Sequence, residues 1–363
     1  MADHDKQGLG IEIRHLYKIF GKTPEKYVDL VRQGMSKTEL NEQHGHVLGL
    51  KDINISMPAG GIQVIMGLSG SGKSTLIRHI NRLIDPTAGE VLVGSDDVVK
   101  MNKDALREYR RHQTAMVFQK FALLPHRTVL DNTVFGLEIQ GKPRSVQEES
   151  ARYWIERVGL KGFEDSYPNQ LSGGMQQRVG LARALANDAP ILLMDEAFSA
   201  LDPLIRVDMQ TVLLDLQKEI RKTIVFITHD LDEALRLGDR IAILRDGEVI
   251  QQGTRQDIVL RPADDYIATF VKEVNRARVV TVESIMEPIV AGMDADLPTV
   301  EEGTLLEEAA RKISLAQSHA LRVVSHKGET LGAIYLATLM SAMVGAEDEA
   351  SAPLTADALR QSA

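Results

Sequence analysis

Residues 67–74, with the sequence Gly-Leu-Ser-Gly-Ser-Gly-Lys-Ser, constrain the fold of this chain more than any other stretch. They fit the phosphate-binding pattern G-x-x-x-x-G-K-[ST] at every defined position. Residues 61–66 before the pattern predict a short buried strand, and residues 75–80 after it begin a helix. A helix N-terminus presents unpaired backbone N–H groups and a positive dipole end to phosphate. The sequence therefore predicts a strand, a phosphate loop and a helix, in that order.

The residue types in this loop fit separate parts of a bound nucleotide. Its glycines let the backbone wrap around phosphate, Lys73 would reach the β- and γ-phosphate oxygens, and the Ser74 hydroxyl would bind Mg²⁺. A glycine-rich turn before a helix can also be only a tight turn, but Lys-Ser in register and the flanking elements favour the phosphate loop. The expected nucleotide contacts are Gly67, Ser69, Gly70, Ser71, Gly72, Lys73, Ser74 and Thr75.

The composition favours a globular chain of about two domains. The 363 residues include no cysteine, which excludes disulfides and thiolate metal sites and suits a reducing compartment. The first residues lack the basic and apolar regions of a signal peptide. The longest uncharged stretch, residues 331–346, is too short for a spanning helix and predicts a strand followed by a buried helix.

Negative charge is concentrated near the end of the sequence. The formal net charge is −9, and residues 279–363 contain 13 Asp and Glu against 5 Lys and Arg, which gives −8. This asymmetry favours a separate C-terminal module. An acidic chain without a basic stripe is a poor candidate for nucleic-acid binding.

Strand and helix patterns alternate along most of the chain, which predicts an α/β fold with a largely parallel sheet covered on both faces. Residues 11–16 alternate like an edge strand, and residues 121–186 are mainly helical. The other strands are expected at 47–56, 89–93, 114–118, 191–194, 224–229 and 240–244.

Residues 23–46 interrupt the expected pair of N-terminal strands. Pro24 suits a first helical position, and Ser36 with Glu39 resembles a capping box that opens a second short helix. The segment therefore predicts a small helical pair, which could be a surface decoration or a partner contact.

Two acidic residues follow the apolar strand at residues 191–194. Asp195 would lie at the carboxyl end of that strand, beside the phosphate loop, where it could hold Mg²⁺ through a water. Glu196 would face another direction and could polarise the attacking water. Most Asp-Glu pairs are merely solvated, but an upstream phosphate loop favours the functional interpretation.

Ser172, Gly173 and Gly174 suggest a second anion site at a helix N-terminus, although they could also form an ordinary serine cap. Each chain already has its own phosphate loop, so the second site would suit the nucleotide of a partner chain. This arrangement predicts a head-to-tail dimer with two ATP molecules at the interface.

The order of these motifs identifies a family. The phosphate loop, Gln119, residues 171–178, Asp195-Glu196, residues 199–202 and His229 occur in sequence. Together they resemble the ATP-binding-cassette ATPases, the nucleotide-binding subunits of transporters. The resemblance covers about the first three quarters of the chain and implies a P-loop NTPase cassette with a RecA-like core, an antiparallel β edge and a helical subdomain.

The resemblance also implies roles for individual residues. Phe20, with Tyr17 as a weaker candidate, matches the aromatic residue that stacks on adenine, and Gln119 matches the glutamine that touches Mg²⁺ and water and senses the membrane subunit. His229 would contact the γ-phosphate and order the catalytic glutamate, and Asp202 would lie in a loop that crosses the dimer interface. The implied catalytic residues are Glu196, His229, Gln119 and Lys73, the implied Mg²⁺ ligands are Ser74, Gln119 and Asp195, and the implied contacts to the partner's nucleotide are Ser172, Gly173, Gly174 and Gln176.

Three stretches narrow the resemblance, namely residues 23–46, 80–83 and 194–202. They are similar to the ATPase subunits of glycine betaine/proline and other quaternary-amine importers. Such a subunit would lie on the cytoplasmic face of the inner or plasma membrane, with a transmembrane permease docked around residues 121–132. A periplasmic or lipid-anchored substrate-binding protein would complete the system. Another cargo, such as an amino acid or polyamine, or a soluble cassette ATPase without a membrane partner, remain alternatives.

The resulting domain prediction has three parts. An ABC ATPase domain would span residues 1–277, with the helical subdomain at about 121–186. Residues 278–345 are similar to a single cystathionine-β-synthase (CBS) repeat with a regulatory role, whose partner repeat would come from a second chain. Residues 346–363 would form an acidic disordered tail.

Overall fold

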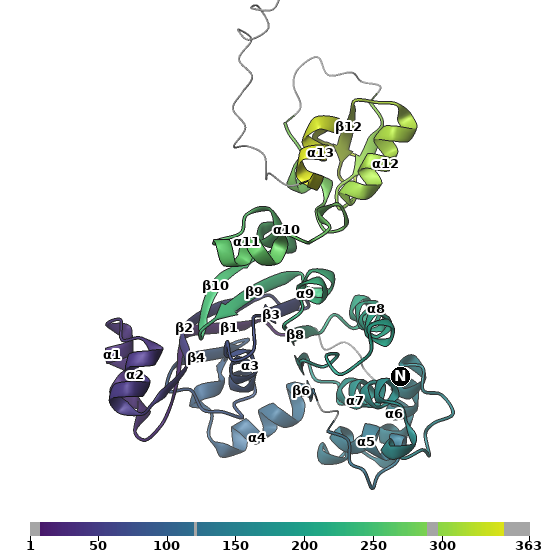
Figure 1. Cartoon of the computed structure of the whole chain (residues 1–363). Coiled ribbons are helices and arrows are strands. Elements are labelled where there is room, and N and C mark those ends of the chain that lie inside the picture. Colours follow the sequence, from purple (N-terminus) through teal and green to yellow (C-terminus); the bar gives the residue numbers. More distant parts are fainter. Residues whose placement is uncertain (1–7, 120–121, 289–296, 345–363) are drawn as a thin grey trace, which may run out of the picture. The chain divides into compact units, whose positions relative to one another are not determined.

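The computed structural model describes residues 8–119, 122–288 and 297–344 (Figure 1). The chain divides into two compact units, Met1–Thr254 and Arg255–Ala363, and each is described by itself. The predicted tail at 346–363 lies outside the described residues. No helix in the described ranges is both long and apolar enough to cross a membrane.

A four-stranded sheet in the first unit has the order β2-β1-β4-β5. Its strands are β1 (Ile11–Phe20), β2 (Val47–Met57), β4 (Ala88–Val93) and β5 (Asp96–Asp97). The prediction of an edge strand at residues 11–16 is wrong, because β1 pairs antiparallel with β2 on one side and with β4 on the other. Its alternating pattern reflects one face packed on the core, not an unpaired edge.

The second sheet has six strands in the order β10-β9-β3-β8-β7-β6. Its strands are β3 (Ile62–Met66), β6 (Thr114–Val117), β7 (Ile191–Asp195), β8 (Thr223–Thr228), β9 (Arg240–Arg245) and β10 (Glu248–Gly253). All neighbours are parallel except β9 and β10, as the largely parallel prediction expects. Every residue of β3, β7 and β8 is buried, because both faces of these central strands are covered by other elements.

The main core lies between the two sheets and the helix that follows β3. It combines buried side chains from β1, β2 and β4 with others from the parallel sheet, such as Ile65, Leu193 and Val225. Leu76, Ile77 and Ile80 of α3 (Lys73–Ile80) complete it. The phosphate loop is thus held between two buried elements.

Helices make up most of the remaining first unit (Figure 1). The segment predicted to be helical, residues 121–186, contains three long helices, whose buried side chains include Val134, Trp154 and Val179. The helices, with two short 3-10 turns, are α4 (Lys103–His112), α5 (Val129–Ile139), α6 (Arg144–Arg157), α7 (Gly173–Ala186), α8 (Pro203–Ile220), α9 (Leu231–Leu237), η2 (Val98–Lys100) and η3 (Pro168–Gln170).

The helical insertion forms as the sequence predicts. It contains η1 (Pro24–Tyr27), α1 (Val28–Arg32) and α2 (Lys37–His44). Ser36 caps α2 by accepting from the Glu39 N–H, while the Glu39 carboxylate accepts from the Ser36 N–H at 2.8 Å. The capping box is therefore confirmed.

The second unit contains a three-stranded sheet of order β11-β12-β13, with β11 parallel and β13 antiparallel to β12. The prediction of a buried helix near residue 340 is wrong, because α13 buries Leu339 but leaves Leu336 and Val344 exposed. The elements are α10 (Arg255–Leu260), α11 (Asp265–Val271), η4 (Arg276–Arg278), η5 (Val282–Ser284), β11 (Thr299–Glu301), α12 (Leu306–Ala316), β12 (Ala320–Val324), β13 (Thr330–Tyr335) and α13 (Leu336–Val344).

Candidate nucleotide-binding site

The phosphate loop joins β3 to α3 and requires glycine at its two ends. Gly67 has a φ of 156°, and a Cβ there would overlap the Leu244 carbonyl oxygen. Gly72, at the N-cap of α3, has a φ of 102°, and its Cβ would lie 2.8 Å from the Gly49 carbonyl oxygen. Side chains at these positions would displace buried backbone, so the close fit of the loop depends on glycine.

Lys73 lies beneath the loop with its amino group already bonded. Nζ donates to the carbonyl oxygens of Gly67 at 2.8 Å and Leu68 at 2.9 Å, and it lies 3.9 Å from Glu196 Oε1. Burial lowers the pKa of this ammonium, and the Glu196 and Asp195 carboxylates oppose that shift. A cation is therefore held at the floor of the loop, within reach of an anion placed there.

Two side chains with oxygen donor atoms meet beside the loop at the end of β7. The Ser74 hydroxyl donates to Asp195 Oδ1 at 2.8 Å, and Arg78 lies 3.6 Å from the other carboxylate oxygen. Mg²⁺ prefers oxygen ligands and keeps several waters and phosphate oxygens. A hydroxyl and a carboxylate at this distance fit that ion.

Glu196 is the point on which three other side chains converge. Its backbone is left-handed, with a φ of 46°, an uncommon conformation that costs free energy and often marks functional sites. Gln119 Nε2 donates to Glu196 Oε2 at 3.1 Å, and His229 Nδ1 lies 3.6 Å from the same oxygen. The structure therefore brings together the four side chains to which the resemblance gives catalytic roles, Gln119, Glu196, His229 and Lys73.

A cavity of about 310 Å³ opens above the loop. Phe20 lines it and is 41% exposed, whereas Tyr17 is only 6% exposed and belongs to the core of the helical insertion. Of the two aromatic candidates, only Phe20 is therefore accessible for stacking. Among the described residues, the lining is Phe20, Lys37, Val47, Leu48, Gly49, Ser69, Gly70, Gly72, Lys73, Ser74, Thr75 and Glu196.

The second anion motif lies at the N-terminus of α7. Ser172 caps this helix by accepting from the Met175 N–H at 3.3 Å, and Gln176 Nε2 donates to the Leu171 carbonyl oxygen at 3.1 Å. A Cβ on Gly174 would approach Ile205 to 2.7 Å, which explains the small residue there. None of residues 172–176 is among the described residues that line the cavity above the loop.

Sequence reasoning missed Arg206, which connects the segments that follow Glu196 and His229. Its guanidinium donates to the Leu201 carbonyl oxygen at 3.0 Å and lies 3.5 Å from Asp230 Oδ2. Arg206 lies on α8, and Asp202 is the N-cap of that helix, accepting from the Ile205 N–H at 3.1 Å. An arginine within a helix carries no local signal of such a bridge, which only the fold creates.

A second cavity, of about 370 Å³, lies where α5 and α7 meet the parallel sheet. Its lining is mainly apolar and includes Leu83, Phe118, Leu124 and Phe135. Arg183 also lines it and donates to the Ala122 carbonyl oxygen at 2.8 Å.

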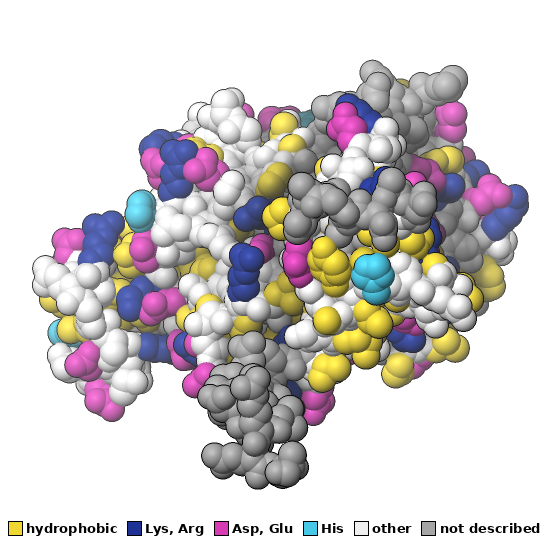
Figure 2. Space-filling view, turned by 90° about the horizontal axis from the view of Figure 1, so that it is seen from above, with side chains coloured by type: hydrophobic (Ala, Val, Ile, Leu, Met, Phe, Trp, Pro, Cys, Tyr) yellow, Lys and Arg dark blue, Asp and Glu magenta, His cyan; other side chains and the backbone are white. Residues whose placement is uncertain are grey.

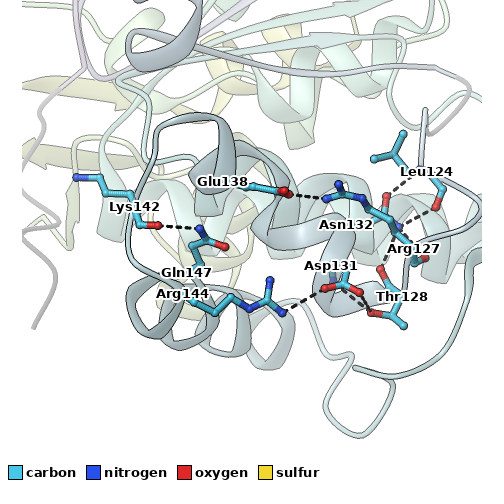
Figure 3. A network of polar contacts seen from close by, with 9 residues as sticks. All are labelled: Leu124, Arg127, Thr128, Asp131, Asn132, Glu138, Lys142, Arg144 and Gln147. Atoms are coloured by element: carbon cyan, nitrogen blue, oxygen red, sulfur yellow. Dashed lines mark hydrogen bonds and ion pairs between the residues drawn. The ribbon is translucent and has the colours of Figure 1, made fainter.

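The loop beside this second cavity is fixed by a buried side-chain amide (Figure 3). Asn132 Nδ2 donates to the carbonyl oxygens of Leu124 at 3.1 Å and Arg127 at 3.0 Å, and its Oδ1 accepts from the Leu124 N–H at 2.8 Å. Arg127 continues the network to Glu138 at 2.6 Å. These hydrogen bonds therefore fix the backbone conformation of the loop at residues 124–128.

A phosphate loop after a parallel strand, with a carboxylate at the carboxyl end of another strand of the same sheet, defines a P-loop nucleotide-binding protein. The family model described as "ABC transporter" matches residues 50–199. The chain is 53% identical to the glycine betaine transport ATP-binding protein OpuAA of Bacillus subtilis, over 78% of this chain and 68% of that protein. It belongs to the ABC transporter family, as an ATP-binding subunit with the cassette fold.

Other relatives extend the similarity. The glycine betaine/proline betaine transport system ATP-binding protein ProV of Escherichia coli is 53% identical over 76% of this chain and 69% of its own length. The trimethylamine N-oxide transport system ATP-binding protein TmoW of Ruegeria pomeroyi is 46% identical over 89% and 94%. Among solved structures, the dimeric bacterial ABC transporter cassette MJ0796 has a TM-score of 0.58 at 33% identity, over 68% of this chain and 98% of that chain.

Proposed function

We propose that this chain hydrolyses ATP to drive import of glycine betaine or a related quaternary amine through a separate permease. The convergence of Gln119, His229 and Lys73 on Glu196 at the phosphate-loop cavity carries the catalytic part of the proposal. The names of the relatives, which include glycine betaine, proline betaine and carnitine transport proteins, support the cargo.

Each residue of the site would then act on a different part of a bound nucleotide. Phe20 would stack on the base, and Lys73 would exchange its carbonyl partners for phosphate oxygens. Ser74, Asp195 and Gln119 would hold Mg²⁺, which neutralises phosphate charge when bound. Glu196 would accept the proton of the attacking water, with His229 and Gln119 fixing its carboxylate.

Two copies of the chain would complete two sites. Ser172, Gly173, Gly174 and Gln176 would meet the γ-phosphate held by the partner's loop, and Asp202 would cross the interface. The solved dimer of MJ0796 bound to ADP and Pi supports a dimeric arrangement. ATP would favour the closed dimer because both phosphate-binding surfaces meet the nucleotide only in that state.

The permease would dock at the mainly apolar cavity beside α5, on the loop that Asn132 fixes. A mainly apolar cavity beside a loop of fixed conformation could bind a short helix of a membrane subunit. Docking there would place the chain at the cytoplasmic face of the membrane, together with a permease and a periplasmic or lipid-anchored substrate-binding protein. Phe121, which the docking prediction included, lies outside the described residues.

The second unit would regulate transport. Its strand, helix and antiparallel strand pair are compatible with the CBS-like module predicted at residues 278–345, following an ATPase domain that ends at residue 277. Deleting residues 279–363 should change the response of transport to salt or nucleotide, and an unchanged response would remove this part of the proposal.

Transport assays test the function directly. A strain without other importers would carry this chain with its permease and binding protein, and uptake of glycine betaine would be compared with that of an amino acid and a polyamine. Uptake of betaine that disappears in a Glu196→Gln variant supports the proposal. Uptake of another cargo alone would correct the substrate, and ATPase activity without any membrane partner would favour a soluble cassette.

A further inference from the structure

The helical insertion at residues 23–46 is fixed to the sheet and does not form a loose decoration. Val28, Val31 and Leu40 are buried and form a separate core with Ile19 and Leu48 of the neighbouring strands. Figure 1 shows this helical pair beside the edge of the antiparallel sheet. Burial of a Val or Leu side chain contributes about 1.5–3 kcal/mol. The position of the insertion relative to β1 and β2 is therefore well determined.

His46 closes the insertion at its base. Its two ring nitrogens lie 2.8 Å from the Lys22 carbonyl oxygen and 2.6 Å from the His44 carbonyl oxygen. Tyr27 packs on this ring with a centroid distance of 4.3 Å. A Cβ on Gly21 would overlap the ring, so the close approach of the strand end to His46 depends on glycine. Both ends of the insertion are thereby tied together where β1 ends and β2 begins.

The insertion contributes one charged side chain to the nucleotide cavity. Lys37, the first residue of α2, lines that cavity together with Phe20 and with Lys73 of the phosphate loop. Lys37 is exposed, and no hydrogen bond or ion pair to it is present among residues 8–119, 122–288 and 297–344. Lys37 therefore brings an exposed positive charge, with no counter-charge among these residues, to a cavity suited to a polyanion.

We propose that Lys37 is a nucleotide-binding residue, through which the insertion binds the phosphate chain of ATP. This inference rests on the proposed function, because it needs ATP at the phosphate loop. The charge of Lys37 increases nucleotide affinity and has no part in bond cleavage. Lys37 accordingly acts on the dissociation constant of ATP.

The test measures ATP dissociation constants with a fluorescent ATP analogue and ATP competition on the full-length chain. Lys37→Ala is expected to weaken ATP binding about fivefold, the upper end for an exposed ion pair, and Lys37→Glu is expected to weaken it further. Lys37→Arg is expected to restore most of the affinity. Lys26→Ala removes an exposed charge elsewhere on the insertion and serves as the matched control.

Salt separates a charge contact from a structural effect. The difference between Lys37→Ala and wild type should shrink as salt rises from about 0.05 M to 0.5 M, because exposed charges are screened. A salt-independent difference, a lowered melting temperature, or equal effects of Lys37→Ala and Lys26→Ala would overturn the inference. ATP affinity equal to that of the wild type in both Lys37→Ala and Lys37→Glu would also overturn the inference. A wild-type chain that binds no ATP would instead overturn the proposed function itself.

Discussion

His79 should make the first unit sensitive to acid through a single buried ring. It lies at the end of α3, the helix that begins at the phosphate loop, and it is only 1% exposed. Nδ1 lies 2.7 Å from the Thr75 carbonyl oxygen and donates to it, which leaves Nε2 unprotonated in the neutral ring. Nε2 is buried without a hydrogen-bond partner in the described part of the chain, so a proton there would be unsatisfied.

The size of the effect follows from the pKa of this ring. Burial lowers the pKa of His79 from 6.5 to about 4. The unfolded chain therefore binds one more proton than the folded chain between these two values, and stability falls as pH decreases through that window. Lowering the pH from 7 to 4.5 should remove roughly 2 kcal/mol of unfolding free energy through this residue alone.

Urea unfolding at several pH values measures this contribution, with the fluorescence of Trp154 as the signal. Trp154 is the single tryptophan and is 2% exposed in α6 of the same unit. His79→Leu should lose roughly 2 kcal/mol less than wild type between pH 7 and 4.5. His126→Gln, at an exposed position, should behave like wild type. Identical pH dependence in wild type and His79→Leu would refute the assignment.

Four further predictions concern the nucleotide site. Glu196→Gln should bind ATP and remain dimeric in size-exclusion chromatography while hydrolysis falls roughly 10²–10⁴-fold, and normal turnover would exclude Glu196 as the base. Lys73→Ala should lose nucleotide binding or turnover, and retention of both would contradict the phosphate-loop role. Ser172→Ala should lower turnover without weakening ATP binding to isolated monomers, whereas full activity would argue against a site shared between chains. Arg206→Ala and Asp230→Asn should each lower turnover with little change in the KM for ATP. Because the two residues form an ion pair, the effects of the two substitutions should be non-additive by about 0.5–1 kcal/mol in the double variant. Strict additivity would show that this ion pair does not affect turnover.

Local sequence patterns predicted the features that depend on residues close together in the chain. The phosphate loop and Asp195 follow apolar strands, and the capping box at Ser36 is complete within four residues. Strand β10 was missed because Glu248–Gly253 is largely polar and only partly buried at the edge of its sheet. Hydrophobic alternation fails as a signal on such a strand.

Features that depend on distant residues were not accessible in the same way. Tyr17 and Phe20 lie on opposite faces of β1, and which face borders the cavity depends on the phosphate loop, which lies far along the chain. Lys37 and Lys73 meet at one cavity only because the insertion packs on the sheet edge. On the face shown in Figure 2, basic and acidic side chains are interspersed, so total charge also fails to locate a functional surface.

The bonds that Lys73 makes within its own loop have a consequence for the speed of the cycle. Because the ammonium already has two carbonyl partners, an arriving phosphate would replace existing bonds, and the net gain in free energy would be smaller than for an unbonded cation. The same exchange would let the loop re-form its internal bonds as the hydrolysed nucleotide departs. A moderate affinity of this kind would favour release of the product in each catalytic cycle.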